Sequence, residues 1–302
     1  MGNETIFMVM CLCITVLSML SQASAAAWTQ RKGAGQAILS LGAYQSSYYF
    51  DNKNHIQSSN STFTKYEFNP FFEYGLTDDM TIGANPLFQH WQNDRANTYP
   101  DSNSRQCYTD STTSGEIIES EFMLRKKLLE SGNAVLSIQP LFKTPCISVN
   151  GNSISTPWNS YETELRLLGG YGFKWDPQGK KRPFAGQHHF IGLEAAYRKR
   201  NGEYSDQVKI DGTAGFRPND NFLILGQFFS VISTREEFVG YTENTEGSFI
   251  QDIDDSCNLK LQLSGIMQVT KTASVQLGIY SDVWGKNYSQ GGGVLASLWQ
   301  GF

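Results

Sequence analysis

The chain of 302 residues lacks a long hydrophobic run beyond its first 25 residues, and it has no strong excess of charge of one sign. A transmembrane helix needs about 20 consecutive apolar residues, so no segment after residue 25 predicts one. The 24 Lys and Arg against 29 Asp and Glu give a net charge of −5. That charge is too small to predict a nucleic acid or another polyanion as a partner.

Histidine and cysteine are also scarce, with four and five residues. The adjacent pair His188 and His189 falls in an expected turn and predicts solvent-exposed rings, because a zinc site needs about three or four ligands. Glu162 and Glu164 lie two apart and share a face, but two carboxylates fall short of the roughly six to eight oxygens that Ca²⁺ prefers. The sequence therefore predicts no metal and no cofactor.

The first residues predict a cleaved secretory signal peptide. Residues 6–20 form an apolar core, and Ala23, Ser24 and Ala25 follow as a small-residue cleavage site. The core of about 15 residues is shorter than the roughly 20 that span a bilayer. Residues 1–7 contain no Lys or Arg, which departs from the usual leader. We expect residues 1–25 to be removed and residues 26–302 to form a single domain.

Alternation of polar and apolar residues dominates the rest of the chain, and it predicts β-strands with one apolar face. In residues 258–270, for example, Leu259, Leu261 and Leu263 alternate with polar residues. Because each spanning strand averages lipid-facing and inward-facing residues, the mean hydropathy of −0.36 is compatible with a membrane barrel. About twelve such segments begin near Gly35, Phe63, Met80, Ile117, Ala134, Tyr161, Phe190, Val208, Phe222, Asn258, Ala273 and Gly293.

The connections between these segments alternate in length. Tight turns are expected at residues 77–79, 131–133, 218–220 and 271–272. Long polar loops are expected at residues 51–62, 94–115, 147–160 and 236–256. An even strand count with short turns on one side and long loops on the other is typical of outer-membrane barrels, whose turns are periplasmic.

Aromatic residues gather at both ends of the expected strands, on the apolar face. Near the turns these are Phe72, Tyr74, Tyr171, Phe173, Trp175, Phe216 and Phe302, and near the loops Tyr66, Phe68, Phe88, Tyr161 and Tyr197. Two such belts are expected at the headgroup levels of a membrane. A soluble β-sandwich would use the same alternation for its core but needs no belts. We predict an all-β transmembrane antiparallel up-and-down barrel of about 12 strands.

Charged residues concentrate on the opposite face, because a Lys or Arg facing lipid at mid-depth costs about 2–4 kcal/mol. The predicted pore-lining residues are Lys65, Glu67, Glu119, Glu121, Arg125, Glu162, Glu164, Arg166, Glu194, Arg198, Lys209, Asp211 and Lys260. Either they line a water-filled pore, or they pair across strands into a network that plugs the barrel. Pairs of Arg125 with Glu119 or Glu121, and of Arg198 with Glu194 or Glu164, would form such a network. A barrel of twelve strands is intermediate in width between small barrels, whose interior is filled by side chains, and large ones, which enclose an aqueous channel.

Cysteines and prolines give two further expectations. Positions 107, 146 and 257 hold the cysteines outside the leader. A disulfide between Cys107 and Cys146 fits an oxidising compartment, and reduced thiols are the equal alternative because the number is odd. Pro70, Pro86 and Pro140 fall within strands, where we expect a bulge or kink since proline cannot donate to the ladder.

Residues 293–302 alternate and end on Phe302, and in this they resemble the closing strand of bacterial outer-membrane β-barrels. The resemblance implies localisation in the outer membrane of a Gram-negative bacterium, with outer-membrane lipid as a partner. It also implies that the barrel-assembly machinery reads the strand that ends in Phe302.

Residues 27–36 and 66–83 are similar to a family of outer-membrane barrels associated with the meta-pathway of phenol degradation. The similarity rests on the run from Glu73 to Asp78 between two strands, and it covers about the first third of the chain. It implies passive uptake of small solutes, including aromatic or other hydrophobic ones, and it assigns no site residue.

A passive channel is therefore the first hypothesis. A non-conducting barrel that acts through its surface loops is the alternative from another class, and an outer-membrane lipid hydrolase is the third. Some twelve-stranded outer-membrane barrels are phospholipases with a His-x-Ser-Asn-Gly sequence. Such an enzyme needs a serine close to a histidine and an asparagine that orients the histidine. None of the four histidines has that context, and only His90 is expected near the lipid face at the loop end. We do not expect an enzyme.

Overall fold

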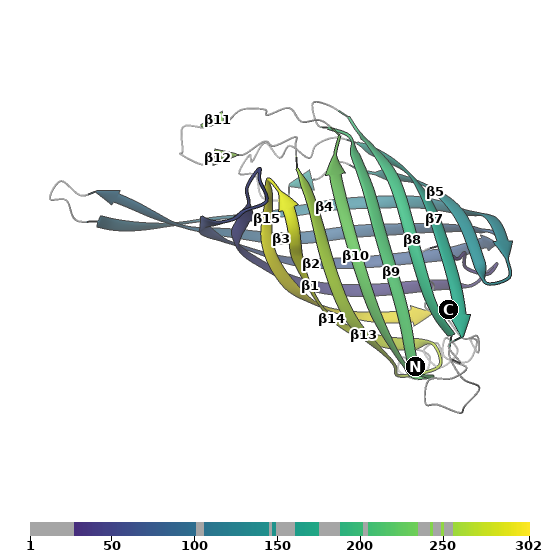
Figure 1. Cartoon of the computed structure of the whole chain (residues 1–302). Helices are drawn as coiled ribbons and strands as arrows, with labels where there is room; N and C mark the ends of the chain where they lie inside the picture. Colours follow the sequence, from purple (N-terminus) through teal and green to yellow (C-terminus); the bar gives the residue numbers. More distant parts are fainter. Residues whose placement is uncertain are drawn as a thin grey trace, which may run out of the picture.

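The computed structural model describes residues 27–100, 106–144, 147–148, 161–174, 188–201, 205–234, 242–243, 249–250 and 256–302. Within these ranges the chain forms one closed antiparallel β-barrel of twelve long strands (Figure 1). No helix long and apolar enough to cross a membrane occurs in the described ranges. The predicted signal peptide and its cleavage after Ala25 lie outside them and stay a prediction.

Each barrel strand pairs with its neighbour in the chain, which is the up-and-down order that the sequence predicts. The barrel strands are β1 (Gly35–Phe50), β2 (Ile56–Thr77), β3 (Met80–Pro100), β4 (Gln106–Ser131), β5 (Ala134–Lys143), β7 (Glu162–Lys174), β8 (His188–Arg200), β9 (Gln207–Asn219), β10 (Phe222–Ser233), β13 (Cys257–Gln268), β14 (Ala273–Lys286) and β15 (Tyr288–Gly301). Three two-residue strands, β6 (Ile147–Ser148), β11 (Thr242–Glu243) and β12 (Phe249–Ile250), lie in the connections.

The barrel closes where β15 pairs with β1, from Gln36 opposite Gly301 to Phe50 opposite Tyr288, with one register shift between Ser46 and Tyr48. Phe302 continues the closure, because its amide donates to the Gly35 carbonyl at 2.9 Å and its carbonyl accepts from the Gly35 amide at 2.8 Å. Closure leaves the described barrel wall without a first or last strand, which is required of a sheet surrounded by lipid. Recognition of Phe302 by an assembly machinery is a separate question and stays a prediction.

One end of the barrel, here the turn end, has the short connections predicted from the sequence. Residues 78–79, 132–133, 220–221 and 269–272 join the strands there. Gly132 has φ +58°, a conformation that the two-residue turn requires and that glycine adopts without strain. The opposite end, here the loop end, is less uniform than expected, because Asn287 alone connects β14 to β15.

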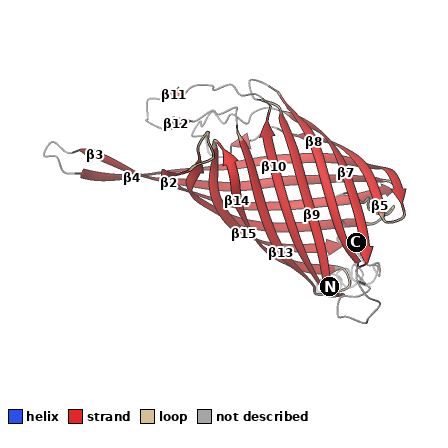
Figure 2. Cartoon of the chain, viewed as in Figure 1, coloured by secondary structure: helices blue, strands red, loops and turns tan. Residues whose placement is uncertain are grey.

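Two predicted long loops are largely strand. Residues 51–62 contain only a short connection, because β2 already begins at Ile56. Within the second one, residues 94–100 and 106–115 extend β3 and β4, whose pairing stays in register from Met80 opposite Lys126 to Pro100 opposite Gln106 and projects beyond the rim as a two-stranded arm (Figure 2). The polar sequence of the arm predicts a loop, but a hairpin that leaves the lipid needs no apolar face.

The outer face of the barrel is apolar, as expected of a surface that faces lipid. Leu41, Leu277 and Ile279 are each more than 60% exposed. Nine of the twelve residues predicted for the aromatic belts are 40–56% exposed on this face: Phe72, Tyr74, Tyr171, Phe302, Tyr66, Phe68, Phe88, Tyr161 and Tyr197. Phe173 and Phe216 contact His189, and Trp175 lies outside the described residues. The predicted transmembrane β-barrel class is confirmed.

His189 contradicts the prediction of an exposed ring. It lies in β8 and is only 1% exposed, because its ring stacks on Phe216 at 4.8 Å between centroids and contacts Phe173 at 5.5 Å. Its Nδ1 accepts a hydrogen bond from the Arg217 amide at 3.2 Å. The strand begins earlier than the sequence suggested, so His189 belongs to the aromatic belt and not to a turn.

The prolines are accommodated differently from the prediction of a bulge or kink. Between β2 and β3 the pairing stops after Phe68 opposite Phe88 and resumes at Phe72 opposite Ala84, so Pro70 and Pro86 fall in the same gap. No register shift accompanies this gap, nor the similar one beside Pro140 between β4 and β5. Two prolines that share one interruption leave fewer backbone groups without a partner than two separate bulges would.

Candidate functional site: the barrel interior

Contacts between strands that are not neighbours identify the inner face of the barrel. Arg198 on β8 lies 2.9 Å from Glu121 on β4, although β5 and β7 separate these strands. Arg166 on β7 reaches Asp211 on β9 at 3.0 Å across β8. Such contacts are possible only across the concave side of a closed sheet, so these side chains point inward.

The inner face of β4, β5, β7, β8 and β9 carries a continuous set of acids and bases, here called the ion-pair wall. Its members are Glu119, Glu121, Lys143, Glu162, Glu164, Arg166, Glu194, Arg198, Arg200, Lys209 and Asp211, whose side chains are each at most 24% exposed. Six carboxylates face five cations in this set, so the wall is nearly neutral.

Arg198 and Glu164 hold the centre of the ion-pair wall. The Arg198 guanidinium contacts Glu164 at 2.6 Å, Glu121 at 2.9 Å and Glu162 at 3.0 Å. Arg166 contacts Glu164 at 2.7 Å and also pairs with Glu194. A guanidinium that pairs with several buried carboxylates has its donors in a rigid fork, which fixes the position of each partner.

Lysines complete the ion-pair wall at its edges. Lys143 lies 2.9 Å from Glu119 and 3.8 Å from Glu162, and Lys209 lies 3.6 Å from Glu164. The acids and bases therefore neutralise one another across strands. This pairing is what the second interpretation of the sequence, a network of ion pairs inside the barrel, predicts.

Arg125 does not pair with Glu119 or Glu121, contrary to the prediction. It pairs with Glu73 at 2.8 Å, and its Nε donates to Gln139 at 2.9 Å. The reason is geometric: Arg125 lies near the turn end of β4, opposite Thr81, and each residue advances a strand by about 3.3 Å. Arg198 also pairs with Glu164, as predicted, but Glu194 pairs with Arg166 instead.

The inner face of β1, β2, β3, β10, β13 and β14 has a different chemistry, here called the aromatic wall. Its members are Tyr44, Phe63, Lys65, Trp91, Phe229, Lys260 and Tyr280. Tyr44 stacks on Tyr280 with centroids 6.2 Å apart and planes 8° apart, and it meets Phe63 edge-on at 6.3 Å. Phe63 in turn stacks on Trp91 at 6.4 Å. Rings from β14, β1, β2 and β3 therefore form a continuous inner surface that also crosses β15, the strand between β14 and β1.

The two lysines of the aromatic wall lie over its rings. Lys65 Nζ is 5.4 Å from the centroid of Tyr44, and it also pairs with Glu67 at 2.8 Å. Lys260 Nζ is 4.9 Å from the centroid of Phe229 and 5.4 Å from that of Tyr280. Among the described side chains, no carboxylate lies within ion-pair distance of Lys260, so cation–π contacts replace the ion pairs of the opposite wall.

Residues 27–34 precede β1 at the turn end and are called the strap below; their first residues lie inside the barrel, whereas residues 31–33 are exposed. Ala27 is 1% exposed and packs with Val135 of β5 and Leu168 of β7. Trp28 packs against the same group, and its ring meets Phe190 of β8 edge-on at 6.3 Å. The strap therefore crosses from β1 to the far side of the barrel.

An apolar cluster fills the turn end beside the strap. Leu223, Leu225 and Ile266 are at most 5% exposed, and Phe190 and Trp299 pack against them. Above the strap, a cavity of about 210 Å³ lies between the walls, lined in part by Phe71, Arg125, Leu141, Arg166 and Leu168. The interior is thus narrowed at one end by apolar side chains and bordered further in by the two walls.

The structure brings most of the predicted pore-lining residues together. Lys65, Glu67 and Lys260 lie on or beside the aromatic wall, Arg125 lies at the strap, and the other nine belong to the ion-pair wall. That these residues line a conducting path is not tested by their positions and stays a prediction. Cys146 and the side chain of Cys107 lie outside the described residues, so their disulfide also stays a prediction.

The aromatic wall and the strap were not predicted from the sequence. Tyr44, Phe63 and Trp91 share the inward register with Lys65 and Glu67, so the alternation that predicts inward charges also predicts these inward rings. The strap has no periodic pattern, and its position depends on contacts with strands far along the chain.

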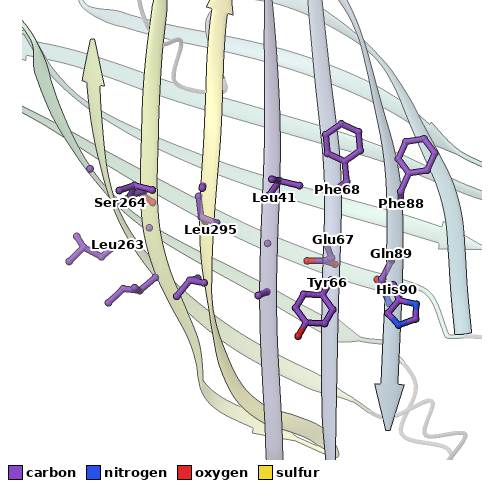
Figure 3. Close-up of a pocket in the computed structure, with 18 of the residues that line it drawn as sticks. Leu41, Tyr66, Glu67, Phe68, Phe88, Gln89, His90, Leu263, Ser264 and Leu295 are labelled. Atoms are coloured by element: carbon purple, nitrogen blue, oxygen red, sulfur yellow. The ribbon is translucent and has the colours of Figure 1, made fainter. Parts of the chain in front are cut away.

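His90 lies on the outer face and not in the interior. It stands opposite Tyr66 and Glu116 in the sheet, 3.9 Å from the Glu116 carboxylate (Figure 3). These residues border a shallow groove of about 1280 Å³ in the apolar outer wall, together with Leu41, Phe68, Phe88 and Leu263. Lipid faces this surface, and among the described contacts of His90 there is no serine that it could activate. No group of three or more potential metal ligands occurs among the described residues.

No protein-family model matches the chain, and no curated protein matches it in sequence. Among solved structures, it is similar to an outer membrane channel from Pseudomonas putida F1, with 12% identity over 93% of this chain and 100% of that one and a TM-score of 0.59. It also resembles the translocator domain of the autotransporter NalP from Neisseria meningitidis, with 8% identity over 99% and 97% of the two chains and a TM-score of 0.46.

A mutant of the TodX monoaromatic hydrocarbon channel is similar as well, with 9% identity over 90% of this chain and 91% of that one and a TM-score of 0.48. At such identities the likeness to the Pseudomonas channel shows the fold alone. The fold is that of an outer-membrane β-barrel, which agrees with the apolar outer face and confirms the predicted architecture.

Proposed function

We propose that this protein is a passive channel of the Gram-negative outer membrane for small solutes, with a preference for aromatic ones. The observation that supports it most is the aromatic wall, which offers stacked rings and two lysines along the inner face of a twelve-stranded barrel. A barrel of this size is wider than small barrels filled by side chains and narrower than large water-filled ones. Its interior can therefore hold a narrow path that small molecules fit.

The nearly neutral ion-pair wall fits a path with weak charge selectivity. Its carboxylates and cations satisfy one another, so neither sign of solute is strongly attracted to it. A flat aromatic solute could instead contact the rings of the opposite wall, where each stacking contact contributes about 0.5–1.5 kcal/mol beyond area burial.

Solute flux into vesicles tests the proposal. Vesicles carry either the mature chain from Ala26 or a chain that begins at Gly33 and lacks most of the strap. Radiolabelled phenylalanine and isoleucine are compared, because they have the same charges and similar size but differ in the ring. Entry of both, with phenylalanine faster, is expected. Entry of neither solute through either chain, with heat-modifiable gel migration proving a folded barrel, would contradict the channel.

The projecting arm supports a second candidate function, a surface-interaction barrel. The arm extends β3 and β4 beyond the rim on the loop side, where a partner could reach it (Figure 2). Trimming residues 95–111 separates the candidates: loss of cell-surface binding with unchanged solute flux would favour the second one. We propose no catalytic role, and a lipase activity of the folded barrel that is lost in His90→Ala would overturn this.

A further inference from the structure

We infer that the strap is a displaceable gate that closes the turn end of the barrel, and that Arg125 is the residue that holds it closed. The inference rests on the proposed channel function, since a gate has meaning only where something passes. It assigns a role to a segment that contributes to neither wall.

Among the described residues, the strap crosses the interior at the turn end, between β1 and the inner faces of β5, β7 and β8. It leaves β1 at Gly35, and Trp28 reaches Phe190 of β8, which is the seventh of the twelve strands in barrel order. Phe190 also packs against the apolar cluster of Leu223 and Ile266. The strap and the cluster together therefore extend over the interior from β1 to β13.

Side chains of the barrel hold the inner half of the strap. Arg125 Nη1 donates to the Trp28 carbonyl at 2.9 Å, and the Ser137 hydroxyl donates to the Ala27 carbonyl at 2.6 Å. The Gln30 amide donates to the Thr81 hydroxyl at 2.8 Å. Arg125 is itself 4% exposed and paired with Glu73, so its guanidinium is positioned before it meets the strap.

The outer half of the strap is held by backbone bonds and can act as a hinge. Gly33 donates to the Gly75 carbonyl at 2.9 Å, and Gly75 donates to the Ala34 carbonyl at 2.9 Å. Ala27, Trp28 and Gln30, in contrast, bond to side chains of the wall, and the Thr29 hydroxyl donates to the Asp78 carbonyl in a turn. None of these bonds belongs to the barrel ladder. Their release would leave every strand pairing intact, which is the condition for a local opening that costs less than unfolding.

A notch in the barrel wall receives the strap. A Cβ on Gly170, which lies on the inner face of β7, would stand 2.4 Å from the Trp28 ring. Glycine inside a strand weakens it and often marks a close approach, here that of the indole. The neighbouring Gly169 faces outward, and a Cβ there would meet nothing nearer than the Leu193 carbonyl at 3.8 Å.

This pair of glycines provides a matched test. Gly170→Val should expel Trp28 and with it the strap, whereas Gly169→Val changes the same strand by the same atoms without touching the strap. Single-channel currents are recorded in planar bilayers for the mature chain, both variants and the chain that begins at Gly33. We expect the time-averaged current to rise about tenfold in Gly170→Val and in the shortened chain, the factor given by loss of one charge-assisted hydrogen bond.

A second readout reports on the strap itself. Ala27→Cys is introduced into a chain whose Cys107, Cys146 and Cys257 are replaced by Ser, and maleimide labelling is followed in detergent. Slow labelling is expected because Ala27 is buried, with faster labelling once Gly170→Val is added and no change with Gly169→Val.

The possible results are distinguishable. Equal currents in all four chains would overturn the gate while the channel stands. Silence in all four, although Gly170→Val accelerates labelling, would overturn the channel and therefore the gate with it. Equal labelling with and without Gly170→Val, accompanied by unchanged currents, would show that the strap is a fixed part of the wall.

Discussion

The two walls of the barrel interior are built on the same alternating pattern, yet they use it in opposite ways. The ion-pair wall places a guanidinium among three carboxylates at Arg198, so each charge depends on the others. The aromatic wall places Lys260 over two rings, with no carboxylate at ion-pair distance among the described side chains. The comparison teaches that the first wall mainly fixes the barrel, whereas the second can exchange its contacts for those of a solute.

The largest expected effect comes from breaking the ion-pair wall at its centre. Arg198→Ala leaves Glu121, Glu162 and Glu164 buried without their shared cation, and removal of one partner from a buried ion pair costs about 3–5 kcal/mol. The free energy of unfolding is measured by denaturant titration in detergent micelles. The matched control is Lys199→Ala, one residue along β8, where the side chain is 60% exposed and the expected loss is below about 1 kcal/mol.

Equal losses of unfolding free energy in Arg198→Ala and Lys199→Ala would contradict the comparison. The buried centre of the ion-pair wall would then stabilise the barrel no more than an exposed side chain of the same strand. A loss in Arg198→Ala that is rescued by also replacing Glu121 with Gln would sharpen the comparison, because Glu121 has its ion pair with Arg198, whereas Glu164 keeps Arg166 and Lys209. That rescue would identify the uncompensated carboxylate as the cause.

The next effect concerns solute passage along the aromatic wall. Trp91→Ala removes one end of the stacked rings, and the loss of about 1 kcal/mol of stacking predicts a roughly fivefold slower entry of phenylalanine. Vesicle uptake of phenylalanine and isoleucine is the measurement. Gln89→Ala, two residues along β3 on the same inner face, serves as control. If both solutes slow equally in Trp91→Ala, the rings set only the width of the path.

A smaller effect should follow from removing the cation that has no ion-pair partner. Lys260→Met keeps the apolar stem, and we expect little change in the free energy of unfolding because no carboxylate loses an ion pair. The reversal potential in a salt gradient should move toward cation selectivity. Lys143→Met, which strips Glu119 of its partner, should instead destabilise the barrel. A reversal potential that stays constant in Lys260→Met would place Lys260 away from the ion path.

The smallest effect lies outside both walls, at the turn end. Lys126 donates to Asp79, and this hydrogen bond, with a second from Thr77, holds the pKa of the Asp79 carboxyl below its usual range. The ionised form is thus favoured in the fold, so its contribution is present above the unfolded pKa of about 3.9 and is lost as pH falls through the lower folded value. The unfolding midpoints of the wild type and Asp79→Asn should differ slightly at pH 7, and the difference should shrink as the pH falls below about 3.9. A difference that grows on acidification would contradict the sign.

Most of the barrel could be predicted from the sequence, because strand periodicity is local. The alternation at residues 258–270 reappears as β13, with Leu261 and Leu263 outward and Lys260 and Gln262 inward. Strand ends were less predictable. The arm of β3 and β4 and the early start of β8 at His188 depend on pairing with a neighbour, which polarity alone does not reveal.

The interior was predictable only in part, and Arg125 shows why. Its inward direction follows from its place in the alternation, but its partner depends on how far the neighbouring strands are shifted along the barrel. The choice of Glu73 over Glu119 or Glu121 therefore required the register, and the bond to Trp28 required the path of a segment nearly one hundred residues away.

The class of this protein could be read from local sequence, since the alternation and the aromatic belts each follow from residues close together in the chain. The meeting of acids and bases on one wall, the meeting of rings on the other and the path of the strap between them became visible with the folded barrel. Closure of the barrel is the physical reason, because it brings strands that are far apart in the chain to face each other across a common interior.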